Sequence, residues 1–188
     1  MPVSESAHAS AQELADTFGG SPTFVACRNE GDARTIDLAL CADSPSAGVS
    51  SLGTVTLADH DLGHDEVRLQ IIAVYPGTAT DFSRAVGTCA LNVVQQGWPL
   101  RWGACHPDVL TLYGLSKTLA HLYYVPPFSW PNGPKRLTVG GRRVEWLQAI
   151  PVSEAERAYA EEHGAAALEK LLADTPIDIT DFDRSSIV

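Results

Sequence analysis

The fold is decided most clearly in the run KRLTVGGRRVEWLQAI, residues 135–150. Two stretches of strand-forming character, residues 135–139 and 142–150, flank the dipeptide Gly140-Gly141. A two-residue glycine linker suits the tight primed turns that join antiparallel strands, because those turns need a positive φ. The run therefore predicts a β-hairpin whose second strand leads into the C-terminal region.

A helix start follows this hairpin. In Ser153-Glu154-Ala155-Glu156 the serine can cap the helix and the second glutamate stands three residues later, which is the capping-box pattern. Gly164 interrupts the helical run after His163, and glycine is a poor helix former. We predict a helix that begins after Ser153, a break at Gly164 and a second short helix over residues 165–173. The tail at Asp181-Phe182-Asp183-Arg184 is expected to be coil on the surface.

The upstream part of the chain predicts two more helices and a group of strands. Helices are expected at residues 7–18, ended by Gly19-Gly20, and at 81–96, where apolar residues recur at the spacing of one buried face. Strands are expected at 23–28, 34–41, 49–58, 66–75 and 121–125. Short connections favour antiparallel pairing. We therefore expect an α+β fold, with a mixed, mostly antiparallel sheet flanked by helices, in a single domain over residues 1–188.

The charge of the chain indicates the kind of partner it attracts. The net charge is −10, from 13 Lys and Arg against 23 Asp and Glu. The excess is uneven, because residues 98–148 hold 2 acids and 6 bases while residues 149–188 hold 9 acids and 3 bases. An acidic field opposes a phosphate backbone, so we expect no direct nucleic-acid partner. A basic protein surface would be attracted instead.

Composition also indicates the compartment. No apolar run approaches the roughly 20 residues of a membrane helix, and residues 1–6 lack the basic and apolar parts of a signal peptide. We expect a cytoplasmic protein that makes no membrane contact. The four cysteines, Cys27, Cys41, Cys89 and Cys105, contain no paired spacing and are expected to be reduced. A bridge between Cys27 and Cys41 is the alternative, since their strands could be neighbours.

Two groups of residues could carry chemistry. Cys105-His106 suggests a nucleophile and a base, but neighbouring residues on a strand point to opposite faces. His121 or His163 could supply the base instead. His60 and His64, with Asp59, Asp61 and Asp65, could bind zinc, although the stretch is typical of a polar turn. No phosphate loop, nucleophile elbow or zinc-protease motif occurs. We expect no catalytic residue, metal or cofactor, and an enzyme that uses Cys105 or His60 and His64 is the alternative.

Aromatic residues gather in segment 98–130, which also holds Arg101 and Lys117. Aromatic side chains and arginine are enriched in binding hot spots. Tyr123 and Tyr124 are neighbours on a predicted strand, so one of them is expected to face outward. The prolines at 126, 127 and 131 favour an edge position, where a partner strand could pair. The predicted partner-binding residues are Trp102, Tyr123, Tyr124, Phe128 and Trp130. The alternative is that these side chains fill the core.

The C-terminal third resembles the suppressor of fused domain family, in its bacterial form. The resemblance lies in the strand 146–150, Pro151-Val152-Ser153-Glu154-Ala155-Glu156, Glu162-His163-Gly164, Ala167-Leu168 and the ending Arg184-Ser185-Ser186-Ile187-Val188. Upstream, the order of strands, helix 81–96 and a Trp- and Leu-rich segment agrees with the family. A Gly-His step that is frequent in the family is replaced here by Cys105-His106.

The resemblance implies an α+β domain without catalytic residues that acts by binding another protein. The animal member sequesters a transcription factor through a peptide segment, and many bacterial members resemble immunity proteins that neutralise a toxin. We therefore expect a bacterial immunity or sequestration protein. Its partner would be a basic toxin or a peptide segment. The sequence leaves the partner, the binding face and the oligomeric state open.

Overall fold

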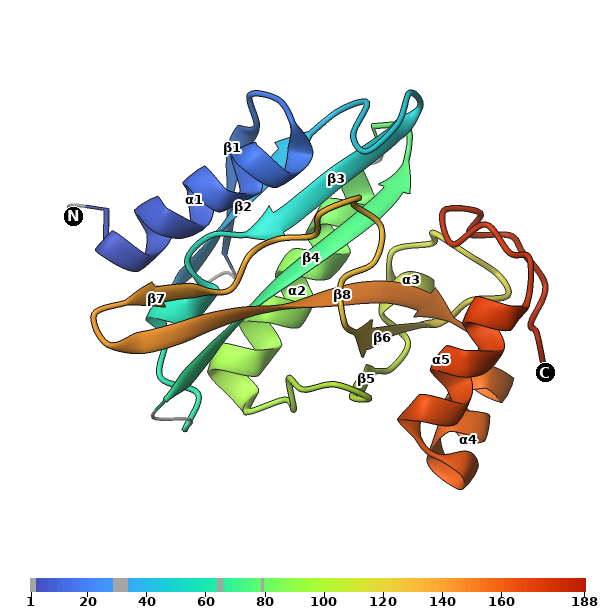
Figure 1. The fold of residues 1–188 in the computed structure, drawn as a ribbon. Coiled ribbons are helices and arrows are strands. Elements are labelled where there is room, and N and C mark those ends of the chain that lie inside the picture. Colours follow the sequence, from blue (N-terminus) through green and yellow to red (C-terminus); the bar gives the residue numbers. More distant parts are fainter. Residues whose placement is uncertain (1–2, 29–33, 64–65, 79) are drawn as a thin grey trace.

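The computed structural model describes residues 3–28, 34–63, 66–78 and 80–188 (Figure 1). Its helices are α1 (Glu5–Phe18), the 3-10 turn η1 (Leu57–Asp59), α2 (Thr80–Gln96), α3 (Val109–Leu112), α4 (Glu154–His163) and α5 (Ala165–Asp174). Its strands are β1 (Thr23–Arg28), β2 (Thr35–Cys41), β3 (Val49–Thr54), β4 (Val67–Pro76), β5 (Cys105–His106), β6 (His121–Val125), β7 (Leu137–Val139) and β8 (Arg142–Val152).

The strands form one mixed sheet, which confirms the predicted fold class. Within the described residues the order is β1-β2-β3-β4-β8-β6-β5, and β7 pairs with the outer end of β8. Every pair is antiparallel except β4 with β8, which run parallel. The strand predicted over 49–58 was too long, because β3 ends at Thr54 and residues 57–59 turn into η1.

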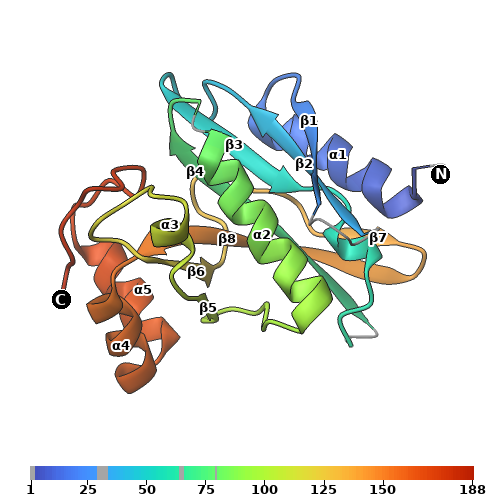
Figure 2. The same ribbon diagram turned by 180° about the vertical axis from the view of Figure 1, so that it is seen from behind.

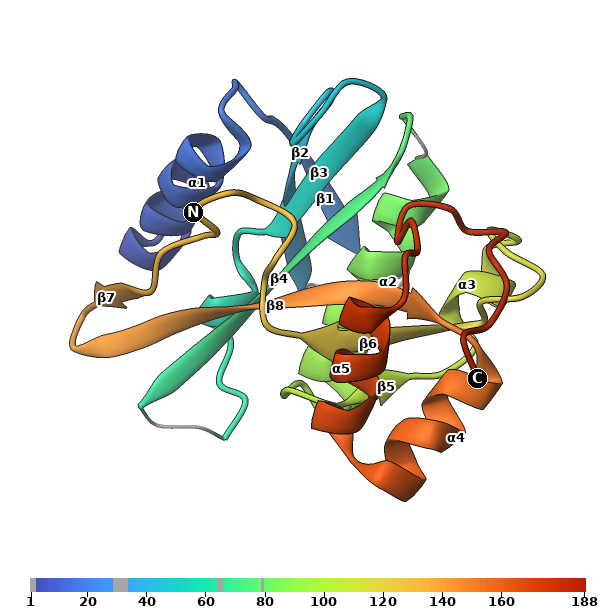
Figure 3. The same ribbon diagram turned by 45° about the vertical axis from the view of Figure 1, so that its right-hand side comes forward.

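Helices cover both faces of this sheet. The long helix α2 lies across one face, as Figure 2 shows, and buries Phe82, Val86 and Ala90 there. The other face carries α1 over one half and the C-terminal helices over the other half (Figure 3). Leu14 of α1 packs in a cluster with Ile72 of β4. Leu168 of α5 packs with residues of β6 and β8. The connection between β6 and β7 contacts both: Trp130 stacks on Phe18 of α1, and residues 126–128 line a groove with α5.

The hairpin and the helix start agree with the sequence. Gly140 and Gly141 have φ values of 57° and 79°, and Val139 pairs with Arg142 across the turn. Ser153 caps α4 with a complete capping box in which the Glu156 side chain bonds the Ser153 backbone. α4 ends at Gly164, and α5 starts directly after it. Besides η1, we did not predict β5 and α3, which are the shortest strand and the shortest α-helix among the described residues.

Candidate functional site

The five predicted partner-binding residues divide into two groups. Trp102 and Phe128 are 49% and 57% exposed. Tyr123, Tyr124 and Trp130 are buried, with exposed fractions of 1%, 0% and 4%. The expectation of an exposed tyrosine in β6 is therefore wrong, and these three side chains belong to the core. For Trp102 and Phe128 partner binding stays a prediction.

Strand β6 is buried because it has neighbours on both sides. It pairs with β8 on one side and with β5 on the other, so the predicted edge position is wrong. The chain before β5 extends this pairing, since Gly103 N donates to Tyr124 O and Tyr124 N donates to Ala104 O. Helices then cover both faces of the strand. Tyr123 packs in the cluster of α5, and Tyr124 packs in the cluster of α2.

A buried glutamine holds the connection that carries Phe128. Gln148 Oε1 accepts hydrogen bonds from the backbone N–H groups of Phe128 (2.9 Å) and Ser129 (3.2 Å). Its Nε2 donates to Ser129 Oγ at 2.6 Å. Trp130, two residues after Phe128, stacks on Phe18 and donates a hydrogen bond from Nε1 to Ser51 Oγ. Because the backbone of Phe128 and Ser129 and the side chain of Trp130 are all anchored, the exposed ring of Phe128 stands on a held backbone.

Trp102 is also presented next to β6. The following residue, Gly103, has a φ of 76°, and a Cβ there would lie 2.8 Å from the Cβ of Ala165. This close approach, which needs glycine, brings the Trp102 backbone against the start of α5. The indole Nε1 donates a hydrogen bond to Glu169 of α5. Trp102 is thus oriented by a contact that leaves about half of its surface exposed.

An apolar groove lies beside Phe128. Its volume is about 740 Å³, within the range of small-molecule and side-chain pockets. One wall is residues 125–128 and the other is formed by α5 and residues 175–179, with Ile150 of β8 also contributing. Pro126 and Pro127 line this groove and also a second cavity of about 350 Å³, which Trp102 lines as well. Trp102 and Phe128 therefore belong to one continuous surface.

The charge on this groove is negative. The two charged residues that line it, Glu169 and Asp178, are both acidic. Glu169 accepts from the neutral indole of Trp102, and Asp178 accepts from the backbone and hydroxyl of Thr180. Within the part of the chain that the structure describes, neither carboxylate forms an ion pair. The surface thus combines exposed aromatic groups, an apolar groove and two carboxylates without a cation.

The geometry around Cys105 gives no support to the alternative of a cysteine enzyme. Burial raises the pKa of the Cys105 thiol to about 12 and lowers that of His106 to about 4. His106 donates from Nε2 to Pro99 O and accepts from the Tyr124 hydroxyl. His121 is also engaged, by the Asp108 backbone N–H and by Glu154. Among the described residues no imidazole contacts the thiol to act as a base.

The polar loop after η1 uses its acids in structural contacts. Asp59 accepts a hydrogen bond from the Ser4 hydroxyl, and Asp61 pairs with Arg68. The backbone N–H of Gly63 and, after it, Arg68 lower the pKa of the Asp61 carboxyl. His64 and Asp65 lie outside the described residues. Within residues 3–28, 34–63, 66–78 and 80–188, no group of three or more potential ligands is placed to hold a metal ion.

All four cysteines are free. Cys27 and Cys41 do lie on paired strands, but Cys27 is opposite Ile36, whereas Cys41 lies at the far end of β2 beyond the Thr23–Leu40 pair. The register thus separates the two thiols by almost the full length of the pairing.

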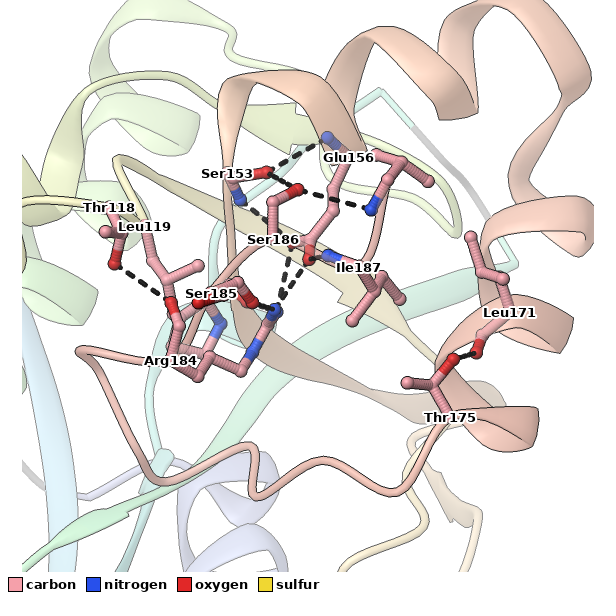
Figure 4. Close-up of polar contacts among 12 residues, drawn as sticks. Thr118, Leu119, Ser153, Glu156, Leu171, Thr175, Arg184, Ser185, Ser186 and Ile187 are labelled. Atoms are coloured by element: carbon pink, nitrogen blue, oxygen red, sulfur yellow. Dashed lines mark hydrogen bonds and ion pairs between the residues drawn. The ribbon is translucent and has the colours of Figure 1, made fainter.

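Sequence reasoning missed the role of the C-terminal tail. We expected surface coil, and Figure 4 shows instead that Arg184 reaches a buried site beside Glu156. Phe182 packs on Phe82 of α2, with ring centroids 5.0 Å apart. The tail is coil, as expected, but Phe182 and Arg184 are buried, whereas Asp181 and Asp183 stay exposed. Residues 175–179 line the groove. The available signal was an arginine close to an acidic stretch, which does not by itself indicate burial.

The comparisons with known proteins agree with this fold. Residues 32–185 match the suppressor of fused protein family, and the chain belongs to that family. The immunity protein YqcF of Bacillus subtilis (strain 168) is 29% identical over 192 residues, and the alignment covers 100% of both chains. The family resemblance drawn from residues 146–188 is thus confirmed.

Solved structures show the same architecture. A chain of the Sufu-Fu complex matches with a TM-score of 0.71 at 12% identity, over 97% of this chain and 89% of that one. A suppressor of fused homologue from Neisseria gonorrhoeae matches with a TM-score of 0.68 at 14% identity, over 98% and 97%. Drosophila Suppressor of Fused matches with a TM-score of 0.65 at 12% identity, over 94% and 48%. In the described ranges, no helix has the length and apolar character to span a membrane.

Proposed function

We propose that this chain is a bacterial immunity protein that neutralises a partner protein by binding it directly, without catalysis. The observation that carries the proposal is the surface formed by Trp102, Phe128 and the apolar groove between Phe128 and α5. Support also comes from the family and from the full-length similarity to a protein named as an immunity protein.

The surface has the physical properties of a binding site. Exposed aromatic side chains contribute large contact areas, and a few such anchors supply most of the energy of an interface. Phe128 and Trp102 are already held by Gln148, Gly103 and Glu169, so little conformational freedom is lost when a partner binds. The net charge of −10 would steer a basic partner toward the protein.

The proposal places the protein in the bacterial cytoplasm. Four free thiols are typical of a reducing compartment. There it would meet a toxin that enters from a neighbouring cell or is made in the same cell.

The test is protection in living cells. Each candidate toxin encoded next to the gene would be expressed with and without this chain, and growth would be measured. We expect the wild-type chain to restore growth and to co-purify with the toxin. The variant Trp102→Ala with Phe128→Asp should lose both. Phe24→Ala is the matched control, because Phe24 of β1 is 56% exposed and lies away from the groove.

If no neighbouring toxin is neutralised, or if the toxin is modified or cleaved by this chain, the proposal is wrong.

A further inference from the structure

The groove beside Phe128 has the shape to receive a side chain from another molecule. Its lining comes from three segments of the chain: residues 125–128, Ile150 of β8, and the continuous stretch 169–179 that runs from α5 into the tail. Gln148 holds the first segment, and Leu168 packs α5 onto β6 and β8. Thr175, which directly follows α5, donates from its hydroxyl to Leu171 O, and the contacts of Phe182 and Arg184 hold the tail beyond the groove. The groove is thus a preformed feature, and a partner would not have to create it.

The lining of the groove favours an apolar group. Val125, Ile150, Leu172, Ile177 and Ile179 contribute aliphatic surface, and the proline pair adds more. Burial of such surface stabilises a complex by roughly 25 cal/mol per Å² of apolar area removed from water. With a volume of about 740 Å³, the groove can hold more than one side chain.

The charges at the groove indicate which side chains of the partner should lie next to that apolar group. Glu169 and Asp178 lie on the α5 wall and the tail wall, and neither is paired with a cation within the described residues. Among the residues that the structure describes, no lysine or arginine lines the groove. The hollow on the other side of Trp102 differs, because two arginines, Arg101 and Arg157, line it against one acid, Glu161, which is already paired with Arg157. A cation on the partner would therefore be recognised at the groove and not at this hollow.

We infer that the groove binds a segment of the partner protein in which an apolar side chain is flanked by lysine or arginine. The apolar side chain enters between Phe128 and α5, and the flanking cations pair with Glu169 and Asp178. This inference rests on the proposed function, because it names the chemistry of the partner at that binding surface. The inference assigns the attraction of a basic partner to two particular carboxylates and not only to the net charge of the protein.

The test uses a random peptide library displayed on phage, selected on the full-length chain. We expect enriched peptides to share an aromatic or large aliphatic residue beside lysine or arginine. A selected peptide would then be synthesised, and its affinity measured at low and high salt by fluorescence polarisation. Phe128→Asp should weaken binding by about tenfold or more. Phe128 is exposed, so this variant should fold, and thermal melting would verify that.

A pair of isosteric substitutions that removes charge tests the cation sites. Glu169→Gln with Asp178→Asn keeps the oxygens that accept hydrogen bonds from Trp102 and Thr180, and it removes two charges. It should weaken the peptide about tenfold at low salt and flatten the salt dependence. The control, Asp16→Asn with Glu162→Gln, removes the same charge from exposed positions on α1 and α4 and should leave the affinity unchanged.

Any of three results would overturn the inference: a library without enrichment, peptides that lack basic residues, or affinities that Phe128→Asp does not change. The growth-protection assay separates this failure from failure of the proposed function. If a toxin is neutralised equally well by wild type and by Phe128→Asp, the protein is an immunity protein that uses another face.

Discussion

Arg184 and Glu156 form a buried two-point ion pair that joins the C-terminal tail to the start of α4. Nη1 of Arg184 lies 2.6 Å from Oε1 of Glu156, and Nη2 lies 3.0 Å from Oε2 (Figure 4). The guanidinium also donates to Pro151 O, and the Glu156 carboxylate accepts from the backbone of Ser153 and Ile187. The glutamate of the capping box therefore has two roles, in helix capping and in anchoring the tail.

Removal of Arg184 should destabilise the fold strongly. Arg184→Met leaves the Glu156 carboxylate buried without its cation, which typically costs about 3–5 kcal/mol. We expect the free energy of unfolding in urea to fall by about that amount. Arg184→Met with Glu156→Gln should recover part of the loss, because no buried charge remains. A loss below about 1 kcal/mol for the single variant would show that the pair is not buried in solution.

The aromatic residues of segment 98–130 should separate into core and surface by mutation. Tyr124→Ala and Trp130→Ala remove buried rings and should each lower the free energy of unfolding by about 3 kcal/mol or more. Phe128→Ala should change it by no more than about 0.5 kcal/mol, since the ring is exposed. Thermal and urea melts check this difference. A normal melt for Tyr124→Ala would restore the original interpretation of β6 as an exposed strand.

His106 should remain neutral well into the acid range. Burial lowers its pKa from 6.5 to about 4, although the hydrogen bond to Pro99 O acts in the opposite direction. In the unfolded chain the ring binds a proton near pH 6.5, so between pH 6.5 and 4 the unfolded state binds more protons than the folded state. This ring therefore makes stability fall as pH decreases through that window. An NMR titration of its ring protons should give a midpoint near 4, and a midpoint at or above 6.5 contradicts its burial.

The thiols should be free but unreactive in the folded protein. Burial raises the pKa of Cys89 and of Cys105 to about 12, and the thiolate is the reactive form. A thiol reagent should count four free cysteines in denaturant without reductant, and Cys89 and Cys105 should react slowly at neutral pH in the native state. A count of two would indicate a disulfide. Rapid native reaction of Cys105 would revive the alternative of cysteine chemistry.

Local signals predicted several elements of this fold. Gly140-Gly141 determined the β7–β8 turn, because few residues other than glycine adopt two successive positive φ values. Ser153 and Glu156 determined where α4 begins, since both capping bonds form between residues three positions apart. Each of these features depends on residues that are close in sequence, and composition alone gave the negative charge. Residues 146–188 contained the motifs that indicated the family.

Tertiary structure decided which of these residues reach the surface. Whether Tyr124 is buried depends on the pairing of β6 with β5 and β8, and on the α2 cluster that covers it. The parallel register of β4 with β8 and the contact between Arg184 and Glu156 likewise join distant parts of the chain. Such pairings form because folding buries apolar surface and leaves buried charges paired, which depends on the whole chain. The groove beside Phe128 exists only where residues 125–128, Ile150 of β8 and residues 169–179 meet.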